Sequence, residues 1–254
     1  MAVSFASSID GFAVIHAAFL APARRPHFEN ELKRVGVEKF QVVETRPISD
    51  HDPRLQYYKG RANGLLSLID GFLCALELAE NSAWKSVAIL EDDIVFRSNF
   101  SNLWSEVEDE VQKTHWGVLT PFRWPCGGAV LVAEPLFAKT SLVALQHNLA
   151  THCVIVSRDH YSALRESLQH CIARGYPCDF FYGIFSSLFP QRLFATTRNL
   201  AGQASLLSST LQQGQVRGGS RYATYRSANR VEAGLINLAY RPLNSLRKWT
   251  RIRV

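Results

Sequence analysis

The sequence predicts an α/β fold, a Rossmann-like and mostly parallel sheet with helices on both of its faces, plus a basic C-terminal tail. Apolar runs and helical periodicity alternate in the order strand, helix, strand, helix, strand over the first 93 residues. That order is typical of a parallel sheet with crossover helices. The third strand, Val87 to Leu90, is short, aliphatic and β-branched, which indicates burial on both faces.

Each of the first elements has its own signal. Residues 13–19 are an apolar run suited to a first strand, and residues 40–43 are suited to a second. Between them, Pro26 can occupy the first turn of a helix that ends at Gly36. The second helix is predicted over residues 64–80. Its apolar face is formed by Leu65, Leu68, Ile69, Phe72, Leu76 and Ala79.

The second half of the chain continues in the same manner. A helix is predicted over residues 99–111, and its acids are expected to form a solvated face: Glu106, Asp109 and Glu110. Three further strands are predicted, at residues 116–120, 128–133 and 151–156. A helix should then follow Ser157 and stop at Gly175 and Pro177.

Composition divides the chain of 254 residues into three parts. Residues 1–202 are predicted to form the folded domain, 203–228 a flexible linker or loop rich in Ser, Gln and Gly, and 229–254 a basic amphipathic segment. Residues 215–254 hold nine Arg or Lys and one acid, so the cationic charge is confined to the tail. This distribution argues against a nucleic-acid-binding protein.

The N-terminus lacks the basic start and long apolar core of a secretory signal. The five cysteines are odd in number and form no CxxC pair, so we expect buried free thiols in a reducing compartment. We therefore expect a cytoplasmic protein. The tail could place it peripherally on the anionic inner face of a membrane, and a solvated or oligomer-contacting tail is the alternative.

Three acids, Glu91, Asp92 and Asp93, directly follow the third predicted strand. Ligands of parallel sheets bind beyond the carboxyl ends of the strands, and clustered carboxylates repel one another unless a cation is present. Alternation along a strand places Glu91 and Asp93 on one side and Asp92 on the other. The pair is a candidate site for a hard divalent cation, and a solvated acidic turn is the alternative.

With these elements in order, the sequence resembles the LPS/collagen-type glycosyltransferases of family 25, which have a GT-A fold. The resemblance spans about residues 12–200. It depends on motifs in matching order: the LEDDIVF strand end (90–96), the upstream helix with Ser67, the strand at Trp116, the THCVIVSR junction (151–158) and the PCD of residues 177–179. The chain departs from the family pattern at Leu68, Gly117 and His27, which leaves the acceptor and the branch of the family open.

The resemblance implies an inverting transfer from a nucleotide sugar, a UDP-sugar above all, to a glycan acceptor such as lipopolysaccharide or a related surface glycan. Asp93 is then the principal ligand of Mn²⁺ or Mg²⁺, and Glu91 shares the metal or the ribose hydroxyls of the donor. Asp92 would contact the donor sugar or support the other two acids. Asp179, an isolated acid among aromatic residues, is the candidate general base, with a loop-capping role as the alternative.

Four other residues carry weaker signals. Arg25, with Arg24 beside it, could contact the donor phosphates, although exposed loop arginines are common. Ser67 could face the donor or the core. His152 could contact the metal or the acceptor, or could be an ordinary buried histidine. Trp124 is a candidate acceptor platform by position only.

Two other functions fit the same residues. A sugar-nucleotide nucleotidyltransferase would also use acids and a metal, but its first loop should be rich in glycine, and residues 21–25 here contain none. A non-catalytic, degenerate transferase that docks a membrane or partner through its tail would explain the altered Leu68 and Gly117.

Overall fold

A computed structural model of the chain describes residues 4–58, 62–122, 139–148 and 150–204. The strands of its main sheet are β1 (Gly11–His16), β2 (Gln41–Glu44), β3 (Ser86–Glu91), β5 (Val118–Thr120), β6 (Leu142–Ala144), β7 (Cys153–Ser157) and β8 (Leu193–Thr196). They lie in the order β2-β1-β3-β7-β5-β8-β6. Among these described strands, β6 and β7 run against the other five. The predicted α/β architecture with a mostly parallel sheet is confirmed.

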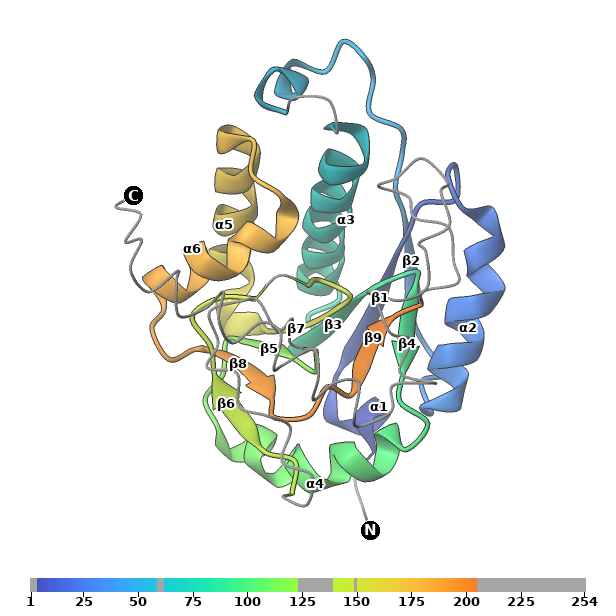
Figure 1. Ribbon diagram of the computed structural model, residues 1–254, viewed down its shortest axis with the longest axis vertical. Helices are drawn as coiled ribbons and strands as arrows, with labels where there is room; N and C mark the ends of the chain where they lie inside the picture. The colour runs from blue at the N-terminus through green and yellow to red at the C-terminus, as the bar shows by residue number, and fades with distance from the viewer. Residues whose placement is uncertain (1–3, 59–61, 123–138, 149, 205–254) are drawn as a thin grey trace, which may run out of the picture.

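Helices cover both faces of the sheet (Figure 1). One layer contains α3 (Ala62–Asn81), α5 (Tyr161–Arg174) and α6 (Phe181–Leu188). The other contains α1 (Phe5–Ser8), α2 (Arg25–Arg34) and α4 (Phe100–Lys113). Short 3₁₀ turns are η1 (Pro22–Arg24), η2 (Pro53–Tyr57), η3 (Arg158–His160) and η4 (Cys178–Phe180).

Strand β3 lies between the two layers, which explains its uninterrupted apolar run. Val87 and Ile89 point into the core beneath α3 and α5, whereas Ala88 and Leu90 point into the core beneath α2 and α4. All four side chains are fully buried. A strand buried on both faces does not alternate between polar and apolar residues.

The elements up to β3 agree with the prediction to within a few residues, except α1, which carries no strong local signal. Glycines end two predicted helices as expected, with φ of +83° at Gly36 and +66° at Gly175. The apolar residues 185–194 are divided between the end of α6 and the start of β8. The strand predicted at 128–133 and the segments 205–228 and 229–254 lie outside the described residues.

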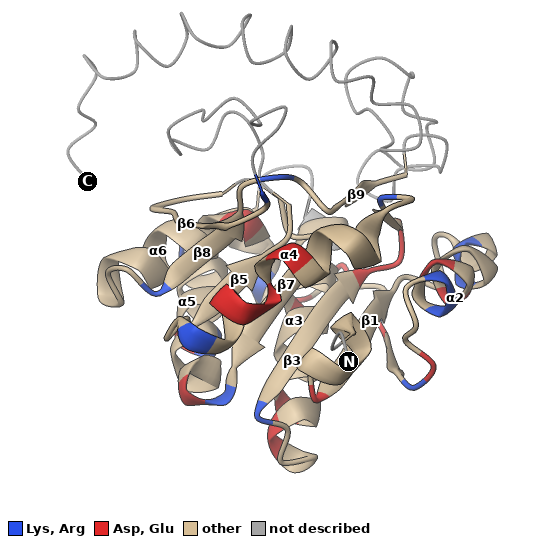
Figure 2. Cartoon of the chain, turned by 90° about the horizontal axis from the view of Figure 1, so that it is seen from below, with Lys and Arg blue, Asp and Glu red and all other residues tan. Residues whose placement is uncertain are grey.

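The acids of α4 correct one prediction (Figure 2). Glu106 accepts hydrogen bonds from the backbone N–H and the hydroxyl of Thr140, at 2.6 and 2.7 Å. Glu110 accepts one from the N–H of Leu142 at 2.8 Å. These two carboxylates therefore hold the entry to β6 and are not a purely solvated face.

Two further expectations concern cysteines and membranes. Cys153, Cys171 and Cys178 are buried free thiols as expected, but Cys74 is exposed. Among the described helices, none has the length and apolar character needed to cross a membrane.

A second sheet, of two strands, closes the structure near the predicted site. Strand β4 (Ile94–Phe96) pairs antiparallel with β9 (Ala201–Gln203), and Ile94 is the register partner of Gln203. The N–H of Ala204 then donates to the carbonyl of Asp93 at 2.8 Å. The chain thus returns, more than 100 residues later, to the acids that follow β3.

Candidate metal and active site

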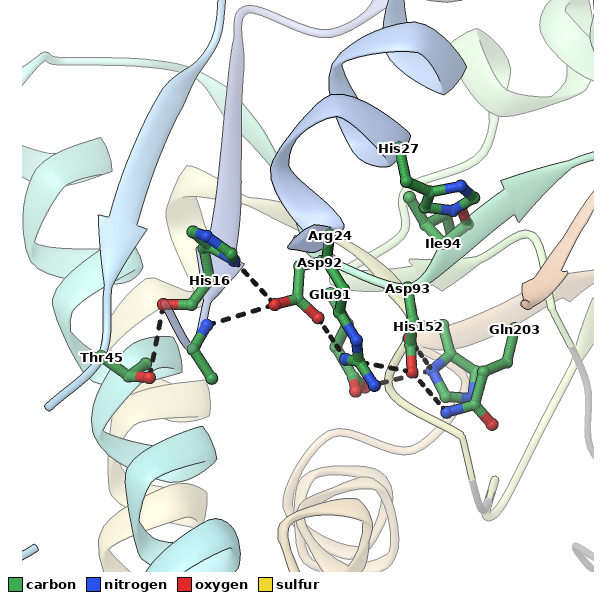
Figure 3. A network of polar contacts seen from close by, with 11 residues as sticks. His16, Arg24, His27, Thr45, Glu91, Asp92, Asp93, Ile94, His152 and Gln203 are labelled. Carbon is green, nitrogen blue, oxygen red and sulfur yellow. Dashed lines mark hydrogen bonds and ion pairs between the residues drawn. The ribbon is translucent and has the colours of Figure 1, made fainter. Parts of the chain in front are cut away.

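Glu91, Asp93 and His152 converge at the carboxyl end of β3 (Figure 3). Glu91 is the last residue of β3, and His152 precedes β7, the antiparallel neighbour of β3. The Nδ1 atom of His152 lies 3.4 Å from Oε1 of Glu91 and 3.6 Å from Oδ1 of Asp93. One ligand atom from each residue lies within 4.8 Å of the other two.

Asp92 faces away from this cluster, as strand alternation predicts. Its Oδ1 accepts from Arg24 at 2.5 Å, and its Oδ2 lies 2.8 Å from Nδ1 of His16 and 3.2 Å from the N–H of Ala17. The guanidinium of Arg24 also reaches Oδ2 of Asp93 at 3.5 Å. Asp92, Arg24 and His16 are all buried, so these contacts favour a supporting role for Asp92.

Neighbouring side chains orient the two clustered carboxylates. The amide of Gln203 donates to Oδ2 of Asp93 at 2.6 Å, and the hydroxyl of Thr151 donates to Oε1 of Glu91 at 2.6 Å. His27, which stands where the resembled family often has arginine, places Nε2 2.8 Å from the carbonyl of Ile94. The contacts of Gln203 and Thr151 restrict the rotamers of the two acids.

Within the described residues, two buried atoms of the cluster have no hydrogen-bond partner. They are Oδ1 of Asp93 and Nδ1 of His152, which face each other. At 3.6 Å the two atoms are within ion-pair distance but too far apart for a hydrogen bond, and buried polar atoms without a hydrogen bond call for an explanation. Both are potential metal ligands, and a shared cation would satisfy them together.

The residues fit a divalent cation. Nitrogen and oxygen ligands lie about 2.0–2.6 Å from such an ion, so two ligands of one ion are at most about 5 Å apart. The separation of up to 4.8 Å in this cluster meets that limit. Imidazole suits transition metals, whereas Mg²⁺ takes oxygen ligands. The mixed set of two carboxylates and one imidazole fits a divalent cation, and the choice between Mn²⁺ and Mg²⁺ stays a prediction.

The cluster attracts positive charge strongly. Burial acts to raise the pKa of Asp93, but contacts with His152, Arg24 and Gln203 outweigh it and hold that pKa well below its usual range. Burial acts to lower the pKa of His152, but Glu91 and Asp93 outweigh it and raise that pKa to about 10. Because a ligating imidazole must be neutral, a metal ion competes with this proton.

Asp179 lies in the first turn of η4, the 3₁₀ turn between α5 and α6. Burial is the main cause that raises its pKa to about 6, and the charge of Glu91 adds to the effect while His152 opposes it. A carboxylate with a pKa near neutrality is suited to accept a proton. Its surroundings of aromatic side chains, expected from Phe180 and Phe181 beside it in the chain, stay a prediction.

The remaining predicted residues lie elsewhere or outside the described residues. Arg25 is exposed and pairs with Glu29 at 2.9 Å, so Arg24, not Arg25, joins the acids. Ser67 is buried in α3 and donates to the carbonyl of Arg46 at 3.3 Å. Trp124 lies outside the described residues, and its acceptor role stays a prediction.

Sequence reasoning missed His16, Thr151 and Gln203. His16 ends β1, the parallel neighbour of β3, so its position at the carboxyl edge was a usable signal. Thr151 stands beside His152 in the recognised junction. Gln203 had no local signal, because only the pairing of β9 with β4 brings it to Asp93.

Comparison with known proteins gives distant likenesses only. No protein-family model and no curated protein matches the chain. A solved glycosyltransferase involved in glycosylation of the PBCV-1 major capsid is similar at 13% identity and a TM-score of 0.45, covering 73% of this chain and 81% of that one.

Two further solved structures are similar. A197 from STIV has 13% identity and a TM-score of 0.40, covering 84% of this chain and 95% of that one. Apo mouse xyloside xylosyltransferase 1 has 10% identity and a TM-score of 0.36, covering 72% and 83%. Two of the three neighbours are glycosyltransferases. With these scores, any function must be argued from the site.

Proposed function

We propose that the protein is a metal-dependent glycosyltransferase that moves a sugar from a nucleotide-sugar donor to a glycan acceptor. The observation that carries the proposal is the convergence of Glu91, Asp93 and His152, in which Oδ1 of Asp93 and Nδ1 of His152 lie 3.6 Å apart without a hydrogen bond. These partly buried residues lie at the carboxyl end of β3, and α/β sheets bind their substrates beyond the carboxyl ends of the strands. Inversion, a UDP-sugar donor and a lipopolysaccharide-type acceptor follow from the family resemblance.

Each residue has a defined task in this proposal. Glu91, Asp93 and His152 hold the cation, which when bound neutralises negative charge on the diphosphate leaving group. Gln203 and Thr151 keep the two carboxylates in place. Asp179 accepts the proton of the acceptor hydroxyl. In the same step the oxygen of that hydroxyl bonds to the anomeric carbon of the donor sugar, and the bond from this carbon to the donor phosphate breaks.

The test is donor turnover. The protein is incubated with Mn²⁺ and a panel of nucleotide sugars, and slow release of free nucleotide by hydrolysis is measured. We expect one donor to be turned over, and Asp93→Asn to lower that rate on the order of 100-fold through weaker metal binding.

Asp159→Asn is the matched control, because it makes the same chemical change at an exposed position in η3. This turn follows β7 at the end of the strands opposite to the acids. Metal-dependent turnover that is equal in Asp93→Asn and the wild type would refute the metal role. No turnover of any donor would count against the transferase.

The competing functions receive less support. Gly117, one of the altered family positions, directly precedes β5, at the end of the strands opposite to the acids. An added Cβ there would lie 2.8 Å from atoms of His160 and Phe185. Its change therefore reflects packing and says nothing of lost activity. Against a nucleotidyltransferase, the loop after β1 offers Arg24 to Asp92 rather than a glycine-rich phosphate cradle. Contact of residues 229–254 with an anionic membrane stays a prediction.

A further inference from the structure

Phe180, the residue after Asp179, contacts two other aromatic rings. The rings of Tyr176 and Phe180 are 5.2 Å apart between centroids and inclined by 33°. The ring of His147 meets that of Phe180 edge-on, at 6.0 Å and 79°. Tyr176 is 37% exposed and Phe180 is 41% exposed, whereas the next residue along the chain, Phe181, is fully buried. Phe180 thus lies on the surface, whereas its neighbour Phe181 packs in the core.

The turn that carries Tyr176 is held firmly. Gly175 adopts a left-handed conformation and approaches the backbone of Tyr57 so closely that an added Cβ would lie 2.0 Å from its carbonyl oxygen. The hydroxyl of Tyr58 donates to the carbonyls of Cys171 and Tyr176, at 3.2 Å each. A ligand that stacks on the rings would therefore meet a largely preformed surface.

The rings flank the candidate general base in the chain, since Asp179 stands between Tyr176 and Phe180. Three residues after Asp179, the hydroxyl of Tyr182 donates to the carbonyl of Ala150 at 2.8 Å, two residues before His152. The segment that carries Asp179 is thus joined to the segment that carries a candidate ligand. Burial lowers the pKa of His147, so its imidazole is neutral at neutral pH. A neutral imidazole can both donate to and accept from a hydroxyl group.

A pyranose ring matches this combination of surfaces. One of its faces is a patch of C–H bonds, which suits aromatic rings, and its rim consists of hydroxyl groups, which suit nearby polar atoms. We propose that Tyr176, Phe180 and His147 form the platform on which a sugar ring of the acceptor glycan stacks, with its reacting hydroxyl toward Asp179. This inference rests on the proposed glycosyl transfer.

Saturation-transfer NMR tests the platform directly. The probe is methyl β-galactoside, whose H3, H4 and H5 share one apolar face, in the presence of UDP and diamagnetic Mg²⁺, since paramagnetic Mn²⁺ would broaden the signals. We expect saturation transfer to these protons from the wild type. The double variant Tyr176→Ala, Phe180→Ala should bind the probe about tenfold more weakly. The variant Tyr176→Phe keeps the aromatic ring and should bind it with wild-type affinity. Leu188→Ala is the control, since Leu188 is 55% exposed at the end of α6.

Donor hydrolysis without acceptor separates this proposal from the function that it extends. We expect the double variant to hydrolyse the donor at the wild-type rate, which also shows that it folds. The platform is overturned if the probe does not bind the wild type, or binds the double variant equally well, or if Leu188→Ala causes the same loss. If the wild type itself does not hydrolyse the donor, that result counts against the proposed transferase instead.

Discussion

Asp92 and Asp93 are adjacent in the chain but have different surroundings. Both oxygens of Asp92 are bonded within the protein, by Arg24, His16 and the N–H of Ala17. Asp93 is bonded at one oxygen by Gln203 and offers the other to the cluster. The pleat of the strand separates the two side chains. At the scale of single residues, this separation gives one acid a structural contact and the other a potential ligand role.

Asp179 gives a prediction at the same scale. Its folded-state pKa of about 6 exceeds the ordinary value of 3.8, so between these values the folded protein retains a proton that the unfolded chain has lost. Stability contributed by Asp179 is therefore present below about pH 4 and is lost as the pH rises through about 6.

We expect Asp179→Asn to be more stable than the wild type at pH 7.5 by roughly 2 kcal/mol, since one pKa unit is about 1.4 kcal/mol and partial exposure reduces the effect. The difference should shrink toward zero near pH 4. Urea unfolding at the two pH values measures it. If the variant is no more stable than the wild type at pH 7.5, ionisation of Asp179 does not destabilise the folded protein.

At the scale of elements, the chain turns through left-handed glycines at the ends of α2 and α5, and the two turns differ in their surroundings. Gly36 has φ of +83° and nothing within 4 Å of an added Cβ. Gly175 has φ of +66° and the carbonyl oxygen of Tyr57 at 2.0 Å. The first glycine serves the backbone conformation alone, while the second also allows η2 to approach α5.

These two positions are a matched pair for mutation to alanine. We expect Gly36→Ala to lower the free energy of unfolding by about 1 kcal/mol, from the left-handed conformation alone. Gly175→Ala should lower it by about 3 kcal/mol or more, because the backbone of Tyr57 must also move. Chemical denaturation measures both variants. Equal losses would mean that the contact with η2 contributes little to stability.

At the scale of the whole molecule, the cluster depends on strands from distant parts of the chain. Antiparallel β7 places His152 beside Glu91, and β9 places Gln203 beside Asp93. A ligand that bridges these elements binds only the folded state and must stabilise it.

We expect Mn²⁺ with UDP, at about 100 times their dissociation constants, to raise the melting temperature by about 5–10 °C. Mn²⁺ alone should give part of the shift, and Asp93→Asn should abolish it, because that change removes a charged ligand. Differential scanning fluorimetry measures the shift. A degenerate scaffold would show no metal-dependent change in melting temperature. A site in which His152 stays protonated, and therefore does not bind the metal, would give the same result.

The sequence by itself determined the α/β class, the order of the first strands and helices after α1, and the position of Glu91 and Asp93 at the end of a buried strand. These features arise from local rules: apolar periodicity, glycine at helix ends, and alternation along a strand. Such rules act over a few residues and can be read from the chain directly.

Only the tertiary structure decided which residues complete the site. The pairings of β7 with β3 and β9 with β4 bring His152 and Gln203 to the acids, and the loop after β1 selects Arg24 over Arg25. Short strands such as β6, β8 and β9 carry little periodic signal, because partners distant in sequence stabilise them. Contacts between such partners arise only when the sheet assembles, so no local pattern records them.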